Sequence, residues 1–170
     1  MNKRKFTAYM GMLLAVAFVL SYIETLIPLN FGVPGIKLGL GNLAVVTALY
    51  TIGIGPAIVL AIMKVLLVTF TFGSFSMFMY SFAGALLSVL VMALLKKLDI
   101  FSCYAVSATG GIMHNVGQIL VAVLITKEIR ITYYLPVLIV SGVVTGAVLG
   151  IIAGLIVKRV SKVLKVDYER

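Results

Sequence analysis

The sequence alternates between long apolar runs and short segments rich in glycine, proline or charged residues. A transmembrane α-helix needs about 20 consecutive, mostly apolar residues, and most of the runs approach that length. The pattern therefore predicts an all-α integral membrane protein with six spans, of which the second is the shortest. We expect the spans at about Phe6–Ile27, Leu38 or Asn42 to Ile52, the Gly53–Pro56 turn to Phe70, Ser76–Leu95, Tyr104–Thr126 and Tyr133–Val157.

The first apolar run follows the basic residues Lys3, Arg4 and Lys5, as the core of a secretory signal peptide would. Its apolar part is longer than the usual 7–15 residues or so of a signal peptide, and no A-x-A-like cleavage site follows it. We therefore interpret it as a span that the protein retains. Residues 1–170 are then expected to form a single membrane domain.

Lysine and arginine gather at one set of span ends. With six spans, ten of the 14 fall on the side of the N-terminus, three fall on the other side, and Lys64 lies inside the third span. Because cytoplasmic loops carry the excess of these residues, both termini are predicted to be cytoplasmic, and the protein is expected in the cell membrane. The ten are Lys3, Arg4, Lys5, Lys96, Lys97, Lys158, Arg159, Lys162, Lys165 and Arg170, and the three are Lys37, Lys127 and Arg130.

Composition excludes several other classes of protein. The chain is 62% hydrophobic and 11% charged, with a mean hydropathy of +1.21, whereas soluble domains are about 45–50% apolar and 25% charged. Disorder needs the opposite composition. The net charge of +9 flanks the spans, so the expected partner is the lipid bilayer and not a nucleic acid. The single cysteine, Cys103, excludes an internal disulfide, and no thiolate metal site is predicted.

Small residues recur at helical spacing in two of the predicted spans. Four glycines in the sixth span lie four residues apart, which places them on one helix face and lets another backbone approach. They either pack inside this chain or form a face for a partner subunit. The first span has a shorter pattern of the same kind in its cytoplasmic half. The glycines are Gly142, Gly146, Gly150 and Gly154, and the shorter pattern is Ala8, Gly11 and Ala15.

Few polar side chains fall inside the predicted spans. A charge at the membrane centre costs roughly 2.5–3.5 kcal/mol on insertion scales, so each such residue is a candidate for function. All of them fall between the midplane and the outer leaflet, which suggests a pocket open to the outside. The candidate substrate-binding residues are Glu24, Lys37, Asn42, Lys64, His114, Asn115 and Gln118.

Each candidate also has a structural interpretation. Glu24 could reach the membrane interface or form an ion pair with Lys64. His114, Asn115 and Gln118 could make hydrogen bonds between helices. His114 and Gln118 share a helix face, and Asn115 points elsewhere.

The segment Pro28–Asn42 joins the first two spans and contains several glycines and prolines, which permit unusual backbone angles. Irregular backbone at membrane depth is tolerated where it lines a cavity or is buried in protein. We predict that Lys37 meets an anionic group of a ligand here. An ordinary interfacial loop with an anchoring lysine is the alternative.

Three strings resemble the Gx transporter family, also labelled heptaprenyl diphosphate synthase component I: Leu20–Glu24, Pro34–Gly39 with Asn42, and His114-Asn115-x-x-Gln118. The likeness covers nearly the whole chain and extends, more distantly, to the substrate-binding S-components of energy-coupling-factor (ECF) transporters. That resemblance implies a six-helix vitamin binder with Pro28–Asn42 as a lid over the ligand. It also implies docking of a coupling subunit on Ala8, Gly11 and Ala15, where Gly11 replaces the more typical alanine.

Three functions are consistent with these sequence features. The first is a substrate-binding subunit of an ECF-type importer for a small, vitamin-like solute related to a flavin or an isoprenoid. ATP would be used by partner subunits, because this chain has no Walker A motif and no cofactor is expected in it. The second is an accessory subunit of heptaprenyl diphosphate synthase. The third is a non-catalytic membrane component of a flavin-linked extracellular electron transfer system.

Catalysis itself is not expected. Prenyl diphosphate elongation needs clustered carboxylates that hold Mg²⁺ against the diphosphate. The two aspartates of this chain, Asp99 and Asp167, are isolated from each other in the sequence. The chain is therefore predicted not to be an enzyme.

Overall fold

The apolar runs fold as helices, which satisfy every backbone hydrogen bond inside the segment, as a bilayer requires. The computed structural model describes residues 2–27 and 39–164. Over these residues it contains six α-helices and one 3₁₀-helix: α1 (Lys3–Leu26), α2 (Asn42–Thr51), α3 (Ile54–Phe72), α4 (Phe75–Leu98), α5 (Cys103–Thr126), η1 (Ile129–Tyr134) and α6 (Leu135–Leu164). The prediction of an all-α chain is confirmed for the described residues.

Most helix boundaries agree with the sequence prediction to within a few residues. Where the apolar run ends in a polar residue, the helix continues into it: α4 includes Lys96 and Lys97 and ends at Leu98. The segment between the fifth and sixth predicted spans, residues 127–132, is partly the short helix η1. The last helix is longer than predicted, because basic residues beyond Val157 extend it to Leu164. Charged residues at span ends are compatible with helix, so an apolar run underestimates the helix length.

Five helical segments of the described residues are long and apolar enough to cross a membrane: α1, α3, α4, α5 and the η1–α6 segment. The protein is therefore membrane-embedded. The second predicted span is α2, whose ten residues reach only about 15 Å at about 1.5 Å per residue, half the thickness of the hydrocarbon core. Nine of these ten residues are buried, so α2 lies inside the bundle, with α1, α3 and α6 packed against it.

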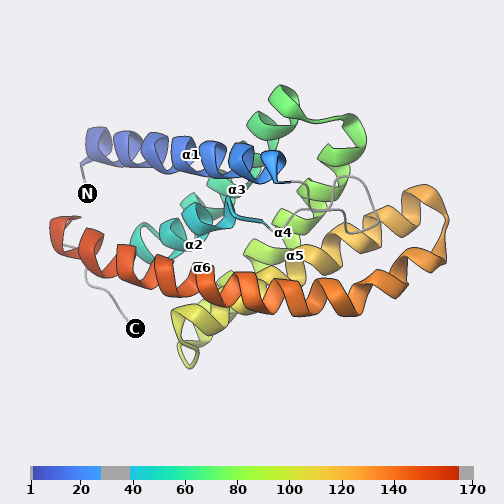
Figure 1. Cartoon of the computed structure of the whole chain (residues 1–170). Coiled ribbons are helices and arrows are strands. Elements are labelled where there is room, and N and C mark those ends of the chain that lie inside the picture. Colours follow the sequence, from blue (N-terminus) through green and yellow to red (C-terminus); the bar gives the residue numbers. More distant parts are fainter. Residues whose placement is uncertain (1, 28–38, 165–170) are drawn as a thin grey trace.

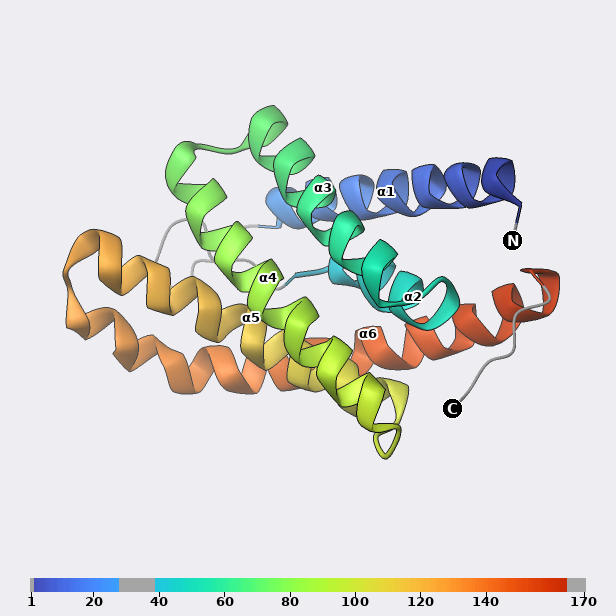
Figure 2. The same cartoon turned by 180° about the vertical axis from the view of Figure 1, so that it is seen from behind.

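The helices form a bundle in which α5 packs along α4 on one side and α6 on the other (Figure 1). Seen from behind, α1 lies across α3 on the far side of α2 from α6 (Figure 2). In both views the start of α1 and the end of α6 lie at the same end of the bundle. We call this the terminal end, and the end that holds the α3–α4 turn and η1 the opposite end.

Basic residues gather at the terminal end. Lys3, Arg4 and Lys5 begin α1, and Lys158, Arg159 and Lys162 belong to the last turns of α6. The assignment of the terminal end to the cytoplasm stays a prediction from this asymmetry. Lys165, Arg170 and the segment 28–38 lie outside the described residues.

Glycines set the distance between α5 and α6. An added Cβ at Gly142 would meet the backbone of Gly111, and one at Gly146 would lie 2.6 Å from the Ser107 carbonyl oxygen. Gly150 packs in the same way on Tyr104, whereas the position of a Cβ on Gly154 is open. Three of the four glycines thus face α5 within the chain, and Gly154 does not.

Lys96 fastens the end of α4 to the end of α2. Its Nζ donates a hydrogen bond of 2.6 Å to the Leu49 carbonyl oxygen and lies 5.1 Å from the centre of the Tyr50 ring. The carbonyls of a last helical turn carry partial negative charge and favour a cation.

We expect Lys96→Met to lower the free energy of unfolding by about 1–2 kcal/mol, because the Leu49 carbonyl loses a charged donor. The measurement is thermal unfolding in detergent. Lys97→Met is the matched control, since Lys97 is exposed and should change stability little. Equal effects of the two substitutions would show that Lys96 contributes only charge to this end of the bundle.

Candidate functional site

Polar side chains are buried at one level of an otherwise apolar bundle. Six of the predicted site residues are at most 8% exposed, and the four considered first are Glu24, Asn42, Lys64 and His114. They come from four different helices: α1, α2, α3 and α5. Burying such groups costs free energy unless they are hydrogen-bonded. Their hydrogen-bond partners are therefore described first.

Glu24 binds the chain that leads into α2. Its two carboxylate oxygens accept hydrogen bonds from the backbone N–H groups of Gly39 and Leu40, the second at 3.1 Å. Gly39 has φ +87°, a conformation that side chains other than glycine rarely adopt. The carboxylate therefore connects the last turn of α1 to the residues just before α2, and the Glu24 side chain is buried inside the bundle, being 6% exposed.

Asn42 and Lys64 form a second connection. The Lys64 Nζ donates a hydrogen bond of 2.6 Å to the Asn42 Oδ1, which links the middle of α3 to the first residue of α2. Gly41 permits this approach, because an added Cβ would lie 3.0 Å from both the Ala17 carbonyl oxygen and the Lys64 Cδ. α1, α2 and α3 thus converge on one glycine.

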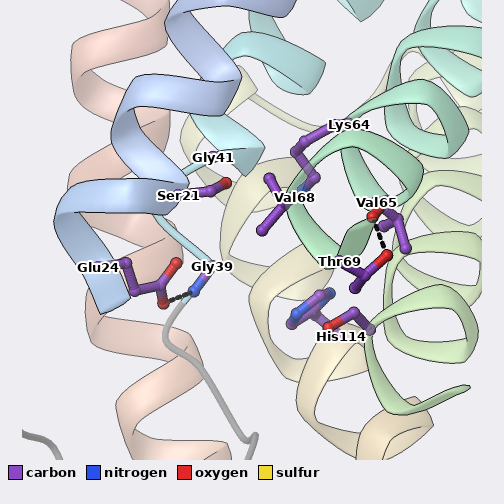
Figure 3. Close-up of a pocket in the computed structure, with 10 residues that line it drawn as sticks. Ser21, Glu24, Gly39, Gly41, Lys64, Val65, Val68, Thr69 and His114 are labelled. Atoms are coloured by element: carbon purple, nitrogen blue, oxygen red, sulfur yellow. Dashed lines mark hydrogen bonds between the residues drawn. The ribbon is translucent and has the colours of Figure 1, made fainter. Parts of the chain in front are cut away.

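Glu24, Lys64 and His114 line a common cavity (Figure 3). Its volume is about 30 Å³, which holds one or two water molecules. The close-up shows the Glu24 carboxylate at Gly39 on one side and the His114 ring next to Thr69 on the other. The complete lining is Ser21, Glu24, Gly39, Gly41, Lys64, Val65, Val68, Thr69, Ser81 and His114.

The other two predicted polar residues of α5 lie on different sides of that helix. Asn115 donates a hydrogen bond of 2.6 Å from Nδ2 to the Leu138 carbonyl oxygen of α6. This is a hydrogen bond between helices, as the structural alternative for Asn115 expects. Gln118 faces α4, where its Cγ approaches Gly84 together with His114. It is fully buried, and neither side-chain amide atom has a partner among the described residues. A buried amide in this state costs about 1–3 kcal/mol per group, which favours a water or a ligand atom beside it.

Sequence reasoning missed several lining residues. Ser21, Thr69 and Ser81 contribute hydroxyl groups, and Gly39 and Gly41 contribute backbone. Ser21 could have been found, because it lies three residues before Glu24 and so shares its helix face. Lys37 and most of the predicted lid fall outside the described residues, and only the last four lid residues, 39–42, are described. Gly39 and Gly41 form one wall of the cavity, whereas Asn42 is not part of its lining.

The cavity offers a cation, a carboxylate, an imidazole and hydroxyl groups inside a low-dielectric bundle. Such groups can orient a small polar or anionic molecule, because electrostatic interactions strengthen where water is excluded. Among residues 2–27 and 39–164, no group of three or more His, Cys, Asp or Glu side chains could hold a metal ion.

The small residues of α1 lie away from this cavity. Ala8, Gly11 and Ala15 are all exposed on the outer face of α1, and an added Cβ at Gly11 would meet nothing within 4 Å. The face is continued by Met12 and Val19, each 52% exposed. No other part of the described chain covers Ala8, Gly11 or Ala15, and the three lie in the half of α1 toward the terminal end.

The comparison with protein families gives one match. The family model described as heptaprenyl diphosphate synthase component I matches residues 13–156, which covers the polar residues of the cavity and all six α-helices in whole or part. Neither the curated proteins nor the solved structures contain a match to this chain.

Proposed function

The chain belongs to the family described as heptaprenyl diphosphate synthase component I, and from that premise we propose that it is the substrate-binding membrane subunit of an ECF-type importer. The observation that carries the proposal is the buried polar cavity between α1, α3 and α5. Glu24, Lys64 and His114 come from three different helices to line it. In a membrane protein, ionisable residues inside the bundle mark solute pathways and binding sites.

The proposed ligand is a small solute with polar or anionic groups. Lys64 and His114 supply donors, and Lys is a common partner of phosphate and carboxylate. Ligand sites typically have volumes of about 300–1,000 Å³, far above the 30 Å³ of the cavity. The cavity must therefore widen to hold such a ligand, and in this proposal binding displaces the segment 39–42, whose Gly39 and Gly41 form one wall of the cavity.

Displacing that wall breaks identifiable bonds. The wall is held by the carboxylate of Glu24 through Gly39 and Leu40 and by Lys64 through Asn42. A ligand with an acceptor group can replace the Asn42 oxygen at Lys64. In this proposal Lys64 therefore holds either the segment 39–42, through Asn42, or the ligand.

The chain is proposed to bind without catalysing a reaction. The carboxylate cluster needed for prenyl diphosphate synthesis is absent from the sequence, whose two aspartates are far apart. Asp99 directly follows α4, at the turn into α5, and Asp167 lies outside the described residues. Hydrolysis of ATP is assigned to partner subunits, and the site of action is the cell membrane. The alternative role as an accessory subunit in prenyl diphosphate synthesis would not require a solute in the cavity.

Docking of the coupling subunit is proposed on the outer face of α1. We expect Gly11→Leu to reduce co-purification with a coupling subunit and its ATPases by about tenfold or more, because a bulky side chain keeps the two backbones apart. The measurement is the yield of the partner subunits on the tagged, co-expressed chain.

Gly154→Leu is the matched control for that substitution. Gly154 is also a helical glycine with nothing within 4 Å of an added Cβ, and it lies on α6 in the turns before the basic end of the helix. It should leave the association unchanged. If Gly154→Leu abolishes association and Gly11→Leu does not, the partner docks on α6 and the assignment to α1 is wrong.

A further inference from the structure

A second cavity lies at the opposite end of the bundle, beside the α3–α4 turn. Its volume is about 340 Å³, within the range of small-molecule sites and much larger than that of the polar cavity. We call it the aromatic cavity, because three of its six lining residues are phenylalanines. The six residues are Thr69, Phe70, Gly73, Ser74, Phe75 and Phe78.

Thr69 lines both cavities. It is 8% exposed, and its hydroxyl group donates a hydrogen bond of 2.6 Å to the Val65 carbonyl oxygen of its own helix. In Figure 3 it lies between Val65 and His114. The two cavities therefore adjoin at Thr69 of α3, whose hydroxyl donor is already used in a hydrogen bond.

The residues of α4 also pass from the lining of the aromatic cavity to that of the polar cavity. Phe78 lines the aromatic cavity and Ser81 lines the polar one, and residues three apart lie on the same helix face. Phe75, Phe78 and Phe82 form a row along this helix, with ring centres 6.4 and 5.5 Å apart. Apolar rings thus lead from the helix turn to the level of the polar groups.

The aromatic cavity is open on the outside of the bundle, beside the α3–α4 turn. Phe70 of α3 is 86% exposed and Phe75 of α4 is 78% exposed, so an apolar chain can enter the aromatic cavity from outside the bundle. A wholly polar solute would gain nothing from such a surface, whereas burial of a hydrocarbon chain against it is favourable.

We infer that the substrate is an amphiphile: its anionic head occupies the polar cavity at Lys64 and His114, and its hydrocarbon tail passes Thr69 into the aromatic cavity. This inference rests on the proposed function and narrows its substrate class. Two sources share the required chemistry, prenyl phosphates and long-chain carboxylates, and both combine an anionic head with an apolar tail.

The test uses two series of probes that keep the head and change the tail. The first is inorganic diphosphate, dimethylallyl diphosphate and farnesyl diphosphate, and the second is acetate, octanoate and palmitate. Binding is measured on the purified full chain in lipid nanodiscs, with empty nanodiscs subtracted. We expect affinity to rise with tail length in one series by about tenfold or more, because several methylene groups become buried, and the series that responds identifies the source.

Variants locate the tail. Phe75→Ala and Phe78→Ala should remove most of that rise, since both rings line the aromatic cavity, and Thr69→Trp should abolish it by filling the passage. Phe101→Ala is the matched control, because Phe101 lies in the α4–α5 turn and should change nothing. Phe75 is largely exposed, so Phe75→Ala is expected to leave the fold intact. If Thr69→Trp does not fold, Phe75→Ala still tests whether the tail occupies the aromatic cavity.

The outcomes separate this inference from the proposed function. A tail-dependent affinity that the two phenylalanine variants remove supports the amphiphile. Binding of the short and long probes with equal affinity, reduced by Lys64→Met but unaffected by Phe78→Ala, overturns the amphiphile and leaves the binding function in place. Binding of no probe in either series overturns the inference, and loss of coupling-subunit association as well would overturn the proposed function.

Discussion

Gly117→Ala is expected to lower the free energy of unfolding by about 1–3 kcal/mol, as overpacking of a core does. Gly117 lies where α5 crosses α4, and an added Cβ would lie 2.8 Å from the Ala83 carbonyl oxygen and 2.9 Å from the Gly84 Cα. Both atoms belong to backbone, so no side chain can rotate away and the two helices must separate. The separation would also disturb His114, whose Nδ1 and carbonyl oxygen adjoin Gly84.

A glycine with open space around it should tolerate alanine without loss of stability. At Gly11 and Gly154 an added Cβ meets nothing within 4 Å, and alanine has a higher helix propensity than glycine by about 1 kcal/mol. Gly11→Ala and Gly154→Ala should therefore be neutral or stabilising. Thermal unfolding of the three variants in one detergent measures the contrast, and a Gly117→Ala protein as stable as the other two would contradict the packing described for α4 and α5.

Glu24→Leu is expected to release the residues that lead into α2. The substitution removes both acceptors of the Gly39 and Leu40 N–H groups, and each buried N–H without a partner costs about 1–3 kcal/mol. Glu24→Gln should have a smaller effect, because the amide keeps one acceptor oxygen of the two. Leucine should therefore destabilise more than glutamine, and both more than a change at an exposed acid.

Hydrogen exchange followed by mass spectrometry measures this release directly. Faster exchange is expected at the amides of Gly39 and Leu40 in both variants, with the helices α4 and α5 unaffected. Glu128→Gln is the control, since Glu128 is exposed in the connection between α5 and η1. Unchanged exchange at these two amides in Glu24→Leu would show that the carboxylate does not hold the wall of the cavity.

The helices could be predicted from the sequence because a single physical requirement dominates them. In lipid, backbone groups must pair within the segment, so each apolar run between polar or glycine-rich breaks becomes a helix. The depth of α2 could not be predicted in this way. Its ten residues have the same composition as a span, and only packing by α1, α3 and α6 shows that the helix is buried inside the bundle.

The candidate site was predictable by residue type and less so by geometry. Glu24, Lys64 and His114 stand out because charge is costly in a span, and all three line one cavity. The contribution of Gly41 depends on a three-helix contact between residues distant in sequence, which no local pattern contains. The different faces of Asn115 and Gln118 follow from their positions on α5, but the sequence does not show that Asn115 bonds to the Leu138 carbonyl oxygen of α6 while Gln118 has no hydrogen-bond partner among the described residues.

The aromatic cavity illustrates the same limit. Phenylalanines at 70, 75 and 78 resemble ordinary lipid-facing residues in the sequence, since apolar side chains are expected there. Their position next to the polar cavity depends on the turn between α3 and α4, which brings Thr69 and Phe78 to the same place. The amphiphilic character of the proposed substrate therefore depends on the two cavities adjoining at Thr69, which the sequence does not show.

The central claim is that the polar cavity binds a solute, and the most direct measurement is native mass spectrometry of the purified chain, followed by identification of any released compound. Wild-type protein and the lipid-facing control Leu124→Ala, at a residue that is 75% exposed, should carry the same compound at up to one copy per chain. Lys64→Met and His114→Ala, each checked for folding by thermal unfolding, should lose it. A wild-type protein that carries no compound after expression with its partner subunits, or a compound retained in full by both variants, would contradict the account.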